Sequence, residues 1–169
     1  MIDGENPEYV QKKLITPKKL ASFAEDVRKR GKTLATLNGS FDLLHAGHLQ
    51  IIYEASKQAD VLLVALNSDA SIKRYKSAQR PIIALRERLQ MMAAIGFVTH
   101  VTWFEEDDPR NLLEIVQPDV HVNGQDWGAN CIEAEVVKKY GGKLHIVSLV
   151  AGLSTSKIMD KIREMHSSV

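Results

Sequence analysis

Two histidines three positions apart, His45 and His48, are the first residues in this sequence whose types and spacing could do chemistry. They close the segment N-G-S-F-D-L-L-H-A-G-H at residues 38–48. If a helix begins here, both imidazoles project from one face and can hold charged oxygens. Gly39 would let the backbone approach a ligand closely, and Gly47 stands where amides at a helix start can point at an anion. The segment predicts an anion site; purely structural histidines and a zinc site are the alternatives.

A second candidate is a basic segment at residues 73–88. It holds one acid, Glu87, and six basic side chains: Lys73, Arg74, Lys76, Arg80, Arg86 and Arg88. Such a run is often only a solvated surface. Here it follows a predicted strand, on the same rim as the histidines if the sheet is parallel. We therefore expect a local site for a small, highly charged anion such as a triphosphate.

The third candidate is G-L-S-T-S-K-I at residues 152–158. Ser154 or Thr155 can cap the helix predicted to follow, which is the ordinary interpretation of the pattern. A helix start with three hydroxyl groups is also able to cradle an anion.

Apolar periodicity places these motifs at the turns of an alternating fold. Residues 60–67 (DVLLVALN) are apolar without alternation, as in strands buried on both faces of a parallel sheet. We predict an α/β fold with one doubly wound, five-stranded parallel sheet, whose ligands bind at the carboxyl ends of the strands. The expected strands are 33–38, 60–67, 99–104, 118–122 and 143–149; the expected helices are 16–30, 45–58, a short one from residue 68, 84–96, one after residue 109, 130–142 and 154–165.

Length and composition limit the remaining possibilities. The 169 residues fit a single domain at 16–169, preceded by residues 1–15, which show no clear period and are expected to form a loose arm. A net charge of +1 argues against nucleic acid or a membrane as a partner of the whole molecule. The single cysteine, Cys131, excludes a disulfide scaffold within the chain and favours a reducing setting. With no signal-like or membrane-spanning apolar stretch, we expect a cytoplasmic protein.

The three motifs, in this order, resemble the H-x-G-H nucleotidyltransferase superfamily. Over about residues 32–162, which would form the catalytic core, GKTLATLNGSFDLLHAGH and VALNSDASIKRYKSAQRPI are most similar to the adenylyltransferases that make ADP-heptose from heptose 1-phosphate and ATP. The resemblance implies a Rossmann-like fold. It also implies transfer of AMP from ATP to a sugar 1-phosphate with release of pyrophosphate. The substrate's own phosphate oxygen attacks, and Mg²⁺ enters as the nucleotide complex without a metal site in the protein.

The resemblance assigns roles to individual residues. The catalytic group is His45, His48 and Lys76. The nucleotide and phosphate group is Asn38, Gly39, Ser40, Phe41, Arg80, Ser154, Thr155 and Ser156. Arg86 would support the site from the following helix, whereas Lys73, Arg74 and Arg88 are expected to be surface charges.

A third group could contact the substrate or the base: Asp42, Arg86, Asn123, Asp126 and Trp127. Trp127 could stack on a base or sugar, or cover the edge of the core. Heptose-type relatives usually carry Lys in a K-G-x-D arrangement where this chain has Asn123, which leaves the sugar open. Asp42 and Asp69 could position a magnesium-bound water or substrate, with helix capping as the alternative for Asp69.

Two rival functions remain open. A cytidylyltransferase acting on glycerol 3-phosphate or another polyol phosphate would use the same motifs, because the choice of base depends on loop contacts that the sequence does not reveal. A non-catalytic nucleotide-binding module would have the same fold but would not catalyse nucleotidyl transfer. Many relatives are dimers, so we also expect a homodimer.

Overall fold

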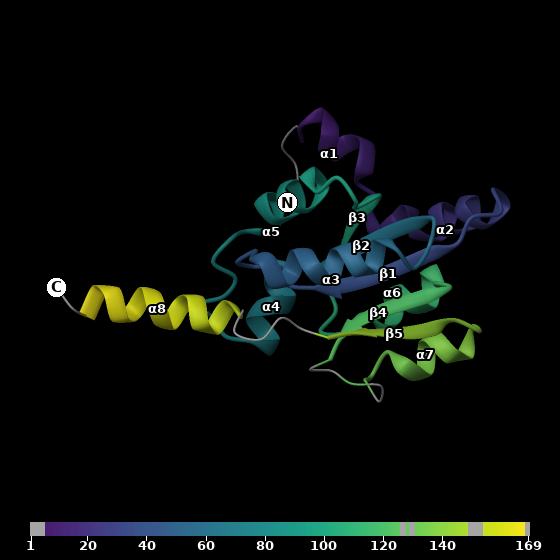
Figure 1. The fold of residues 1–169 in the computed structure, drawn as a ribbon. Helices are drawn as coiled ribbons and strands as arrows, with labels where there is room; N and C mark the ends of the chain where they lie inside the picture. The colour runs from purple at the N-terminus through teal and green to yellow at the C-terminus, as the bar shows by residue number, and fades with distance from the viewer. Residues whose placement is uncertain (1–5, 126–127, 129–130, 149–153, 168–169) are drawn as a thin grey trace.

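The computed structural model describes residues 6–125, 128, 131–148 and 154–167. Its centre is one five-stranded sheet of order β3-β2-β1-β4-β5, and every neighbouring pair is parallel (Figure 1). The strands are β1 (Leu34–Gly39), β2 (Val61–Asn67), β3 (His100–Phe104), β4 (Val120–Gly124) and β5 (Lys143–Val147). The predicted α/β architecture is confirmed.

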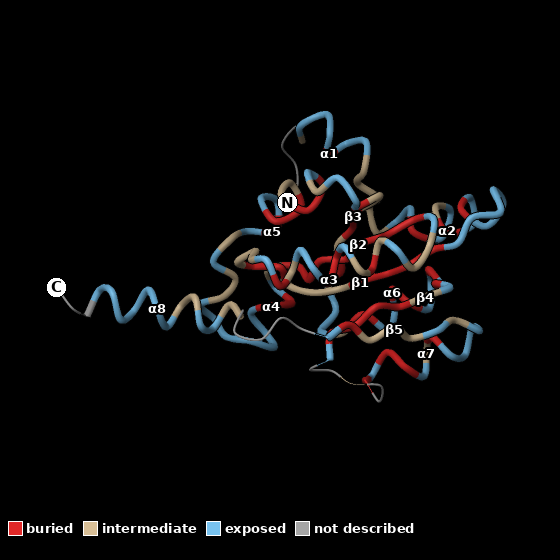
Figure 2. Tube along the Cα trace, viewed as in Figure 1, coloured by how far each residue is buried: buried red, intermediate tan, exposed pale blue. Residues whose placement is uncertain are grey.

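Helices cover both faces of this sheet, which is why its central strands are apolar without alternation. All seven residues of β2 are buried. In Figure 2 the tube of β2 is coloured as buried. Leu62, Val64 and Leu66 belong to one core, and Leu63 and Ala65 to the other. The first core is closed by α3 (Ala46–Ser56) and α5 (Leu85–Ala94), and the second by α2 (Leu20–Lys29), α6 (Arg110–Val116) and α7 (Ala134–Lys139).

The strand order creates a crevice beside β1. The chain runs outward from β1 through β2 to β3, then crosses back to place β4 on the other side of β1. At such a switch point the connections leave in opposite directions, so the carboxyl ends of β1 and β4 stay open to a ligand. Two further helices are α4 (Asp69–Tyr75), which follows β2, and α8 (Thr155–Ser167), which follows the last strand.

The expected loose arm at residues 1–15 is wrong for its second half. Residues Glu8–Lys13 form helix α1, in which Val10 is fully buried against the first core. The Ile15 amide donates to the Val101 carbonyl (2.9 Å), and Lys13 Nζ donates to the Ile95 carbonyl (3.0 Å). One helix of six residues is too short to show a period, so only its contacts with β3 and α5 reveal it. A 3₁₀ turn (Pro17–Lys19) then leads into α2.

One buried titratable group lies at the centre of the sheet. His121 on β4 is fully buried, and its Nδ1 lies 2.8 Å from Thr36 Oγ1 on β1. Its Nε2 has no hydrogen-bond partner among the described residues. Burial lowers the pKa of His121 to about 4.

The stability of the protein is therefore expected to fall in mild acid. Between about pH 6.5 and pH 4 the unfolded chain binds a proton on His121 and the folded chain does not, so the free energy of unfolding decreases as the pH falls. This residue alone contributes about 3 kcal/mol to that decrease. His121→Gln is expected to flatten the decrease by this amount in urea unfolding measured from pH 7 to pH 4. His166→Gln, on the exposed end of α8, is the control. Equal pH slopes for the wild type and His121→Gln would contradict the assignment.

No helix among the described residues is long and apolar enough to cross a membrane.

Candidate active site

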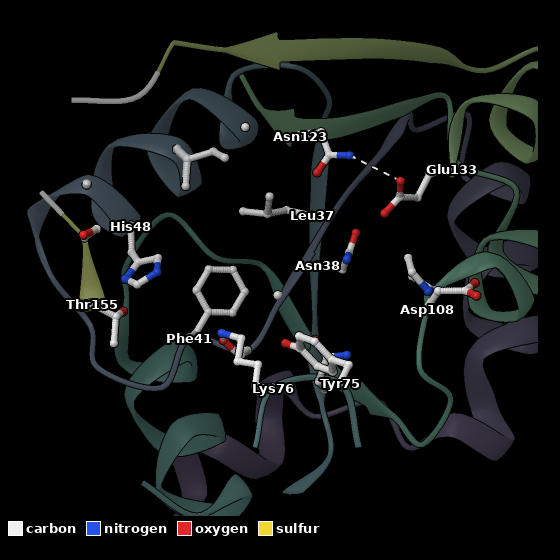
Figure 3. A pocket seen from close by; sticks show the side chains of 18 of the residues that line it. Leu37, Asn38, Phe41, His48, Tyr75, Lys76, Asp108, Asn123, Glu133 and Thr155 are labelled. Carbon is white, nitrogen blue, oxygen red and sulfur yellow. Dashed lines mark hydrogen bonds between the residues drawn. The ribbon is translucent and has the colours of Figure 1, made fainter. Parts of the chain in front are cut away.

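A cavity of about 400 Å³ opens where β1 and β4 end. Figure 3 shows side chains from both strands and from the surrounding turns lining it. Its lining brings together residues from all three sequence motifs: Asn38, Gly39, Ser40, Phe41, His45, Gly47, His48, Lys76, Ser154 and Thr155. Residues up to 117 positions apart in the chain thus meet at the predicted rim.

The two histidines form a stacked pair at the start of α3. His45 is the N-cap residue in extended conformation, without a side-chain capping bond, and its ring centroid lies 3.9 Å from that of His48. The His48 ring also contacts Phe41 edge-on, at 5.4 Å between centroids. Both Nδ1 atoms are buried and have no partner among the described residues. Since buried polar atoms in proteins are nearly always paired, the two nitrogens indicate a place for a bound ligand.

Burial also sets the charge of this pair. It lowers the pKa of His48 to about 4, with smaller contributions from the positive charges of His45 and Lys76. Burial lowers the pKa of His45 as well. At neutral pH the free site therefore holds neutral imidazoles, and bound phosphate oxygens would raise both pKa values by favouring the charged form.

The turn after β1 is shaped by one close approach. A Cβ added at Gly39 would lie 3.1 Å from the Phe41 ring, so glycine lets that ring lie beneath the turn. Phe41 itself has a φ of 46°, a left-handed conformation that is uncommon outside glycine and that clusters at functional sites. The absence of a side chain at Gly39 therefore makes room for the Phe41 ring, a role that was not expected from the sequence.

Lys76 enters the cavity from the end of α4. Its Nζ donates to Ser40 Oγ (2.8 Å), and burial, with Arg80 nearby, lowers the pKa of its ammonium group. Tyr75 also lines the cavity. Sequence reasoning did not single out this tyrosine, although it lies in the quoted basic segment.

Arg80 and Asp42 lie behind the cavity and do not line it. The Arg80 guanidinium pairs with the Asp42 carboxylate at 2.5 Å and also contacts Met159 Sδ of α8. The buried Asp42 accepts hydrogen bonds from the amides of Ile82 and Ile83 (both 2.9 Å). Asp42 is thus not placed to contact the substrate, as the sequence had suggested. It connects the loop after α4 to the turn after β1, and Arg80 connects the same loop to α8.

The arginine that supports the site is Arg88, which corrects two sequence expectations. Arg86 is exposed and does not line the cavity. Arg88, expected on the surface, is fully buried and donates to the carbonyls of Ser40 (2.7 Å), Asn67 (2.9 Å) and Ile83 (2.9 Å). It also pairs with Asp69 at 2.6 Å. Asp69 therefore anchors Arg88, while Ser68 caps α4 through the Ser71 amide.

The third motif contributes two of its three hydroxyl residues. Ser154 Oγ accepts from the Lys157 amide (3.2 Å), so Ser154 is the cap of α8, and both Ser154 and Thr155 line the cavity. Ser156 is exposed and does not line it, because it lies on the next helical position.

On the side formed by β4 and the segment after it, the cavity is lined by Asn123, Gly124, Ile132 and Glu133. Asn123 lies at the end of β4, and its Nδ2 donates to Glu133 Oε2 at 3.5 Å (Figure 3). Sequence reasoning missed Glu133, and nothing in its local pattern separates it from the exposed Glu135. Asp107 and Asp108, in the loop between β3 and α6, also line the cavity. Hydrogen bonding to Arg110 lowers the pKa of Asp108. Asp126 and Trp127 lie outside the described residues.

Comparison with known proteins identifies the family. The sequence model of the cytidylyltransferase-like family matches residues 36–168. The chain belongs to this family, and with it to the nucleotidyltransferases. The match spans β1 to α8 and so includes all three motifs that meet in the cavity.

Several curated relatives are similar over most of the chain. "Bifunctional protein HldE" of Geotalea uraniireducens is 44% identical over 145 residues, which cover 85% of this chain and 30% of that protein. The protein of the same name from Pseudomonas paraeruginosa is 44% identical over 141 residues, 83% of this chain and 30% of the relative. The chain thus spans about a third of the length of these relatives.

Two solved structures share the fold. The lipopolysaccharide core biosynthesis protein of Thermoplasma volcanium is 26% identical with a TM-score of 0.58, covering 71% of this chain and 98% of that one. Pantoate-beta-alanine ligase of Francisella tularensis, at 16% identity and a TM-score of 0.58, covers 89% of this chain and 78% of the other. The second likeness concerns the fold alone.

Proposed function

We propose that this chain transfers AMP from ATP to the phosphate of a heptose 1-phosphate, releasing pyrophosphate and forming an ADP-sugar. One observation carries the proposal: two half-buried imidazoles, whose buried Nδ1 atoms have no partner among the described residues, lie in one cavity with Lys76 and the starts of two helices. The similarity to proteins named HldE and to a lipopolysaccharide core biosynthesis protein supports a sugar phosphate as the acceptor.

The reaction needs no nucleophile from the protein. A phosphate oxygen of the acceptor attacks the α-phosphorus of ATP, and the bond from that phosphorus to the bridging oxygen breaks on the opposite side. The bonding electrons leave with pyrophosphate. The chain's task is to align the two anions and to stabilise the negative charge that develops on the α-phosphate and the bridging oxygen.

Each side chain has a part in this task. His45 and His48 donate to the α-phosphate and the bridging oxygen. Lys76, the hydroxyl groups of Ser154 and Thr155, and the first amides of α3 hold the β- and γ-phosphates. Arg80, held by Asp42, positions the loop that carries Lys76 and contacts α8.

Mg²⁺ enters as part of the nucleotide substrate, held chiefly by phosphate oxygens. Among the described residues no three His, Cys, Asp or Glu side chains gather as ligands for a metal. Asp107 and Asp108 line the cavity and carry the oxygen atoms that Mg²⁺ prefers for any remaining contact.

A second candidate is a cytidylyltransferase acting on a polyol phosphate, which the family's name favours. Pyrophosphate release should be followed for ATP and CTP, each with heptose 1-phosphate and with glycerol 3-phosphate. We expect turnover with ATP and heptose 1-phosphate. Turnover confined to CTP would support the second candidate. Nucleotide binding without pyrophosphate release for any pair would support a non-catalytic module.

We further propose a homodimer in the cytoplasm, where ATP is available and the single cysteine stays reduced. Helix α8 extends away from the sheet, and its residues 160–166 are exposed, including Ile162 and Met165 (Figures 1 and 2). Such exposed apolar side chains suit a contact with a second copy. Light scattering after size-exclusion chromatography decides between one copy and two.

A further inference from the structure

Glu133 is a buried carboxylate that the proposed chemistry does not yet use. Only 4% of the residue is exposed, and it lines the cavity. No ion pair to it is found among the described residues. Arg110, whose pKa its charge helps to raise, pairs with Asp108 at 2.9 Å. A buried carboxylate without a paired cation is costly in free energy.

The contacts of Glu133 do not offset this cost. Asn123 Nδ2 donates to Oε2 at the long distance of 3.5 Å. This donor is uncharged. A carboxylate that accepts one long hydrogen bond from a neutral carboxamide has acceptor capacity left for a ligand.

A second acceptor without a partner lies in the same cavity. Asn38 Oδ1, at the end of β1, is buried and has no hydrogen-bond partner among the described residues. Figure 3 shows Asn38, Asn123 and Glu133 in one part of the view, apart from His48 and Thr155. The cavity therefore has one end with the Lys76 ammonium group and the two imidazoles, which are neutral in the free site, and another end rich in acceptors.

The chemistry of the acceptor-rich end selects its ligand. A carboxylate repels phosphate, so this end receives an uncharged part of a substrate. The wall accepts hydrogen bonds through the Glu133 carboxylate, and the carboxamides of Asn38 and Asn123 can also donate. Groups that both donate and accept match this wall best, and hydroxyl groups do so.

We propose that Glu133, together with Asn38, accepts hydrogen bonds from sugar hydroxyl groups of the substrate and so determines specificity. The proposal rests on the proposed function. The hydroxyl groups belong either to the ribose of the nucleotide or to the acceptor sugar.

The test compares Glu133→Gln with the wild type. Gln has the same shape and keeps an oxygen for Asn123, so the fold is retained. Losing the charge weakens the bond to a hydroxyl donor and is expected to raise KM for one substrate roughly 10- to 100-fold. Because an unpaired buried charge is removed, the melting temperature is expected to stay equal or rise. Glu135→Gln, at an exposed position of α7, is the matched control.

The arms of the experiment distinguish the two sources of hydroxyl groups. ATP is compared with 2′-deoxy-ATP and 3′-deoxy-ATP, and heptose 1-phosphate with glycerol 3-phosphate. If Glu133 binds the ribose, KM rises for ATP, and Glu133→Gln has little effect with the analogue that lacks the hydroxyl group. If it binds the acceptor, only the KM of heptose 1-phosphate rises.

Two results would count against these conclusions in different ways. No pyrophosphate release by the wild-type enzyme with any pair would refute the proposed function. Wild-type turnover with unchanged KM values in Glu133→Gln would refute only the role of Glu133. A fall in melting temperature that accounts for the lost activity would also refute it, because Glu133 would then be structural.

Discussion

His48→Ala is expected to lower kcat for nucleotidyl transfer by about 10²- to 10³-fold, the usual cost of removing one donor to charge that develops in a transition state. His48 is the more buried of the two histidines, and its Nδ1 has no partner among the residues that the structure describes. The loss should appear in kcat and kcat/KM alike, because the donor acts most strongly on the transition state. Steady-state pyrophosphate release measures both.

The fold of this variant is expected to persist. The imidazole is neutral at pH 7, and within the described part of the chain its Nδ1 makes no hydrogen bond, so its removal leaves no buried charge unpaired. Thermal unfolding checks this, and His166→Ala on the exposed end of α8 serves as the control. Near-normal turnover by His48→Ala would overturn the assignment of His48.

Arg88→Met is expected to lower the free energy of unfolding by about 3–5 kcal/mol. The substitution keeps much of the buried volume but removes four hydrogen bonds. The carbonyls of Ser40, Asn67 and Ile83 lose their donor, and Asp69 loses its cation. Urea unfolding at pH 7 measures the change.

A control substitution shows how much the loss of an exposed arginine by itself changes the free energy of unfolding. Arg30→Met, at the exposed end of α2, is expected to change the free energy of unfolding by less than about 0.5 kcal/mol. Because Arg88 holds the Ser40 carbonyl, the folded fraction of Arg88→Met should also turn over more slowly. If Arg88→Met lowers the free energy of unfolding by less than about 1 kcal/mol, the buried guanidinium does not anchor the turn after β1.

From the sequence Arg88 was expected on the surface, and there is a physical reason why this was wrong. Leu85, Arg88, Leu89 and Met92 lie on one face of α5, so helical spacing itself places Arg88 among apolar neighbours. Arginine is nevertheless mostly exposed in proteins. The burial of Arg88 is made favourable by the carbonyls of Ser40 and Asn67, which the parallel sheet brings together where β1 and β2 end. The Ile83 carbonyl and the Asp69 carboxylate complete its set of partners.

The fold, unlike the burial of Arg88, could be predicted from local sequence patterns. Unbroken apolar runs, helical spacing and turn residues act over a few positions, so the order of elements and the parallel sheet follow from the sequence. Residues 8–13 are the exception, because a single short helix depends on its contacts with α5 and β3.

What the sequence by itself determined was the α/β architecture and the rim on which an anion site must lie. It also placed the two histidines, Lys76 and the capped start of α8 on that rim, because their positions follow from where strands end and helices begin. The tertiary structure decided which charged side chains face the cavity. Asp42 and Arg80 turned toward each other, Arg88 was buried and Glu133 entered the wall. Long side chains take their direction from neighbours distant in the chain, and no local pattern records those neighbours.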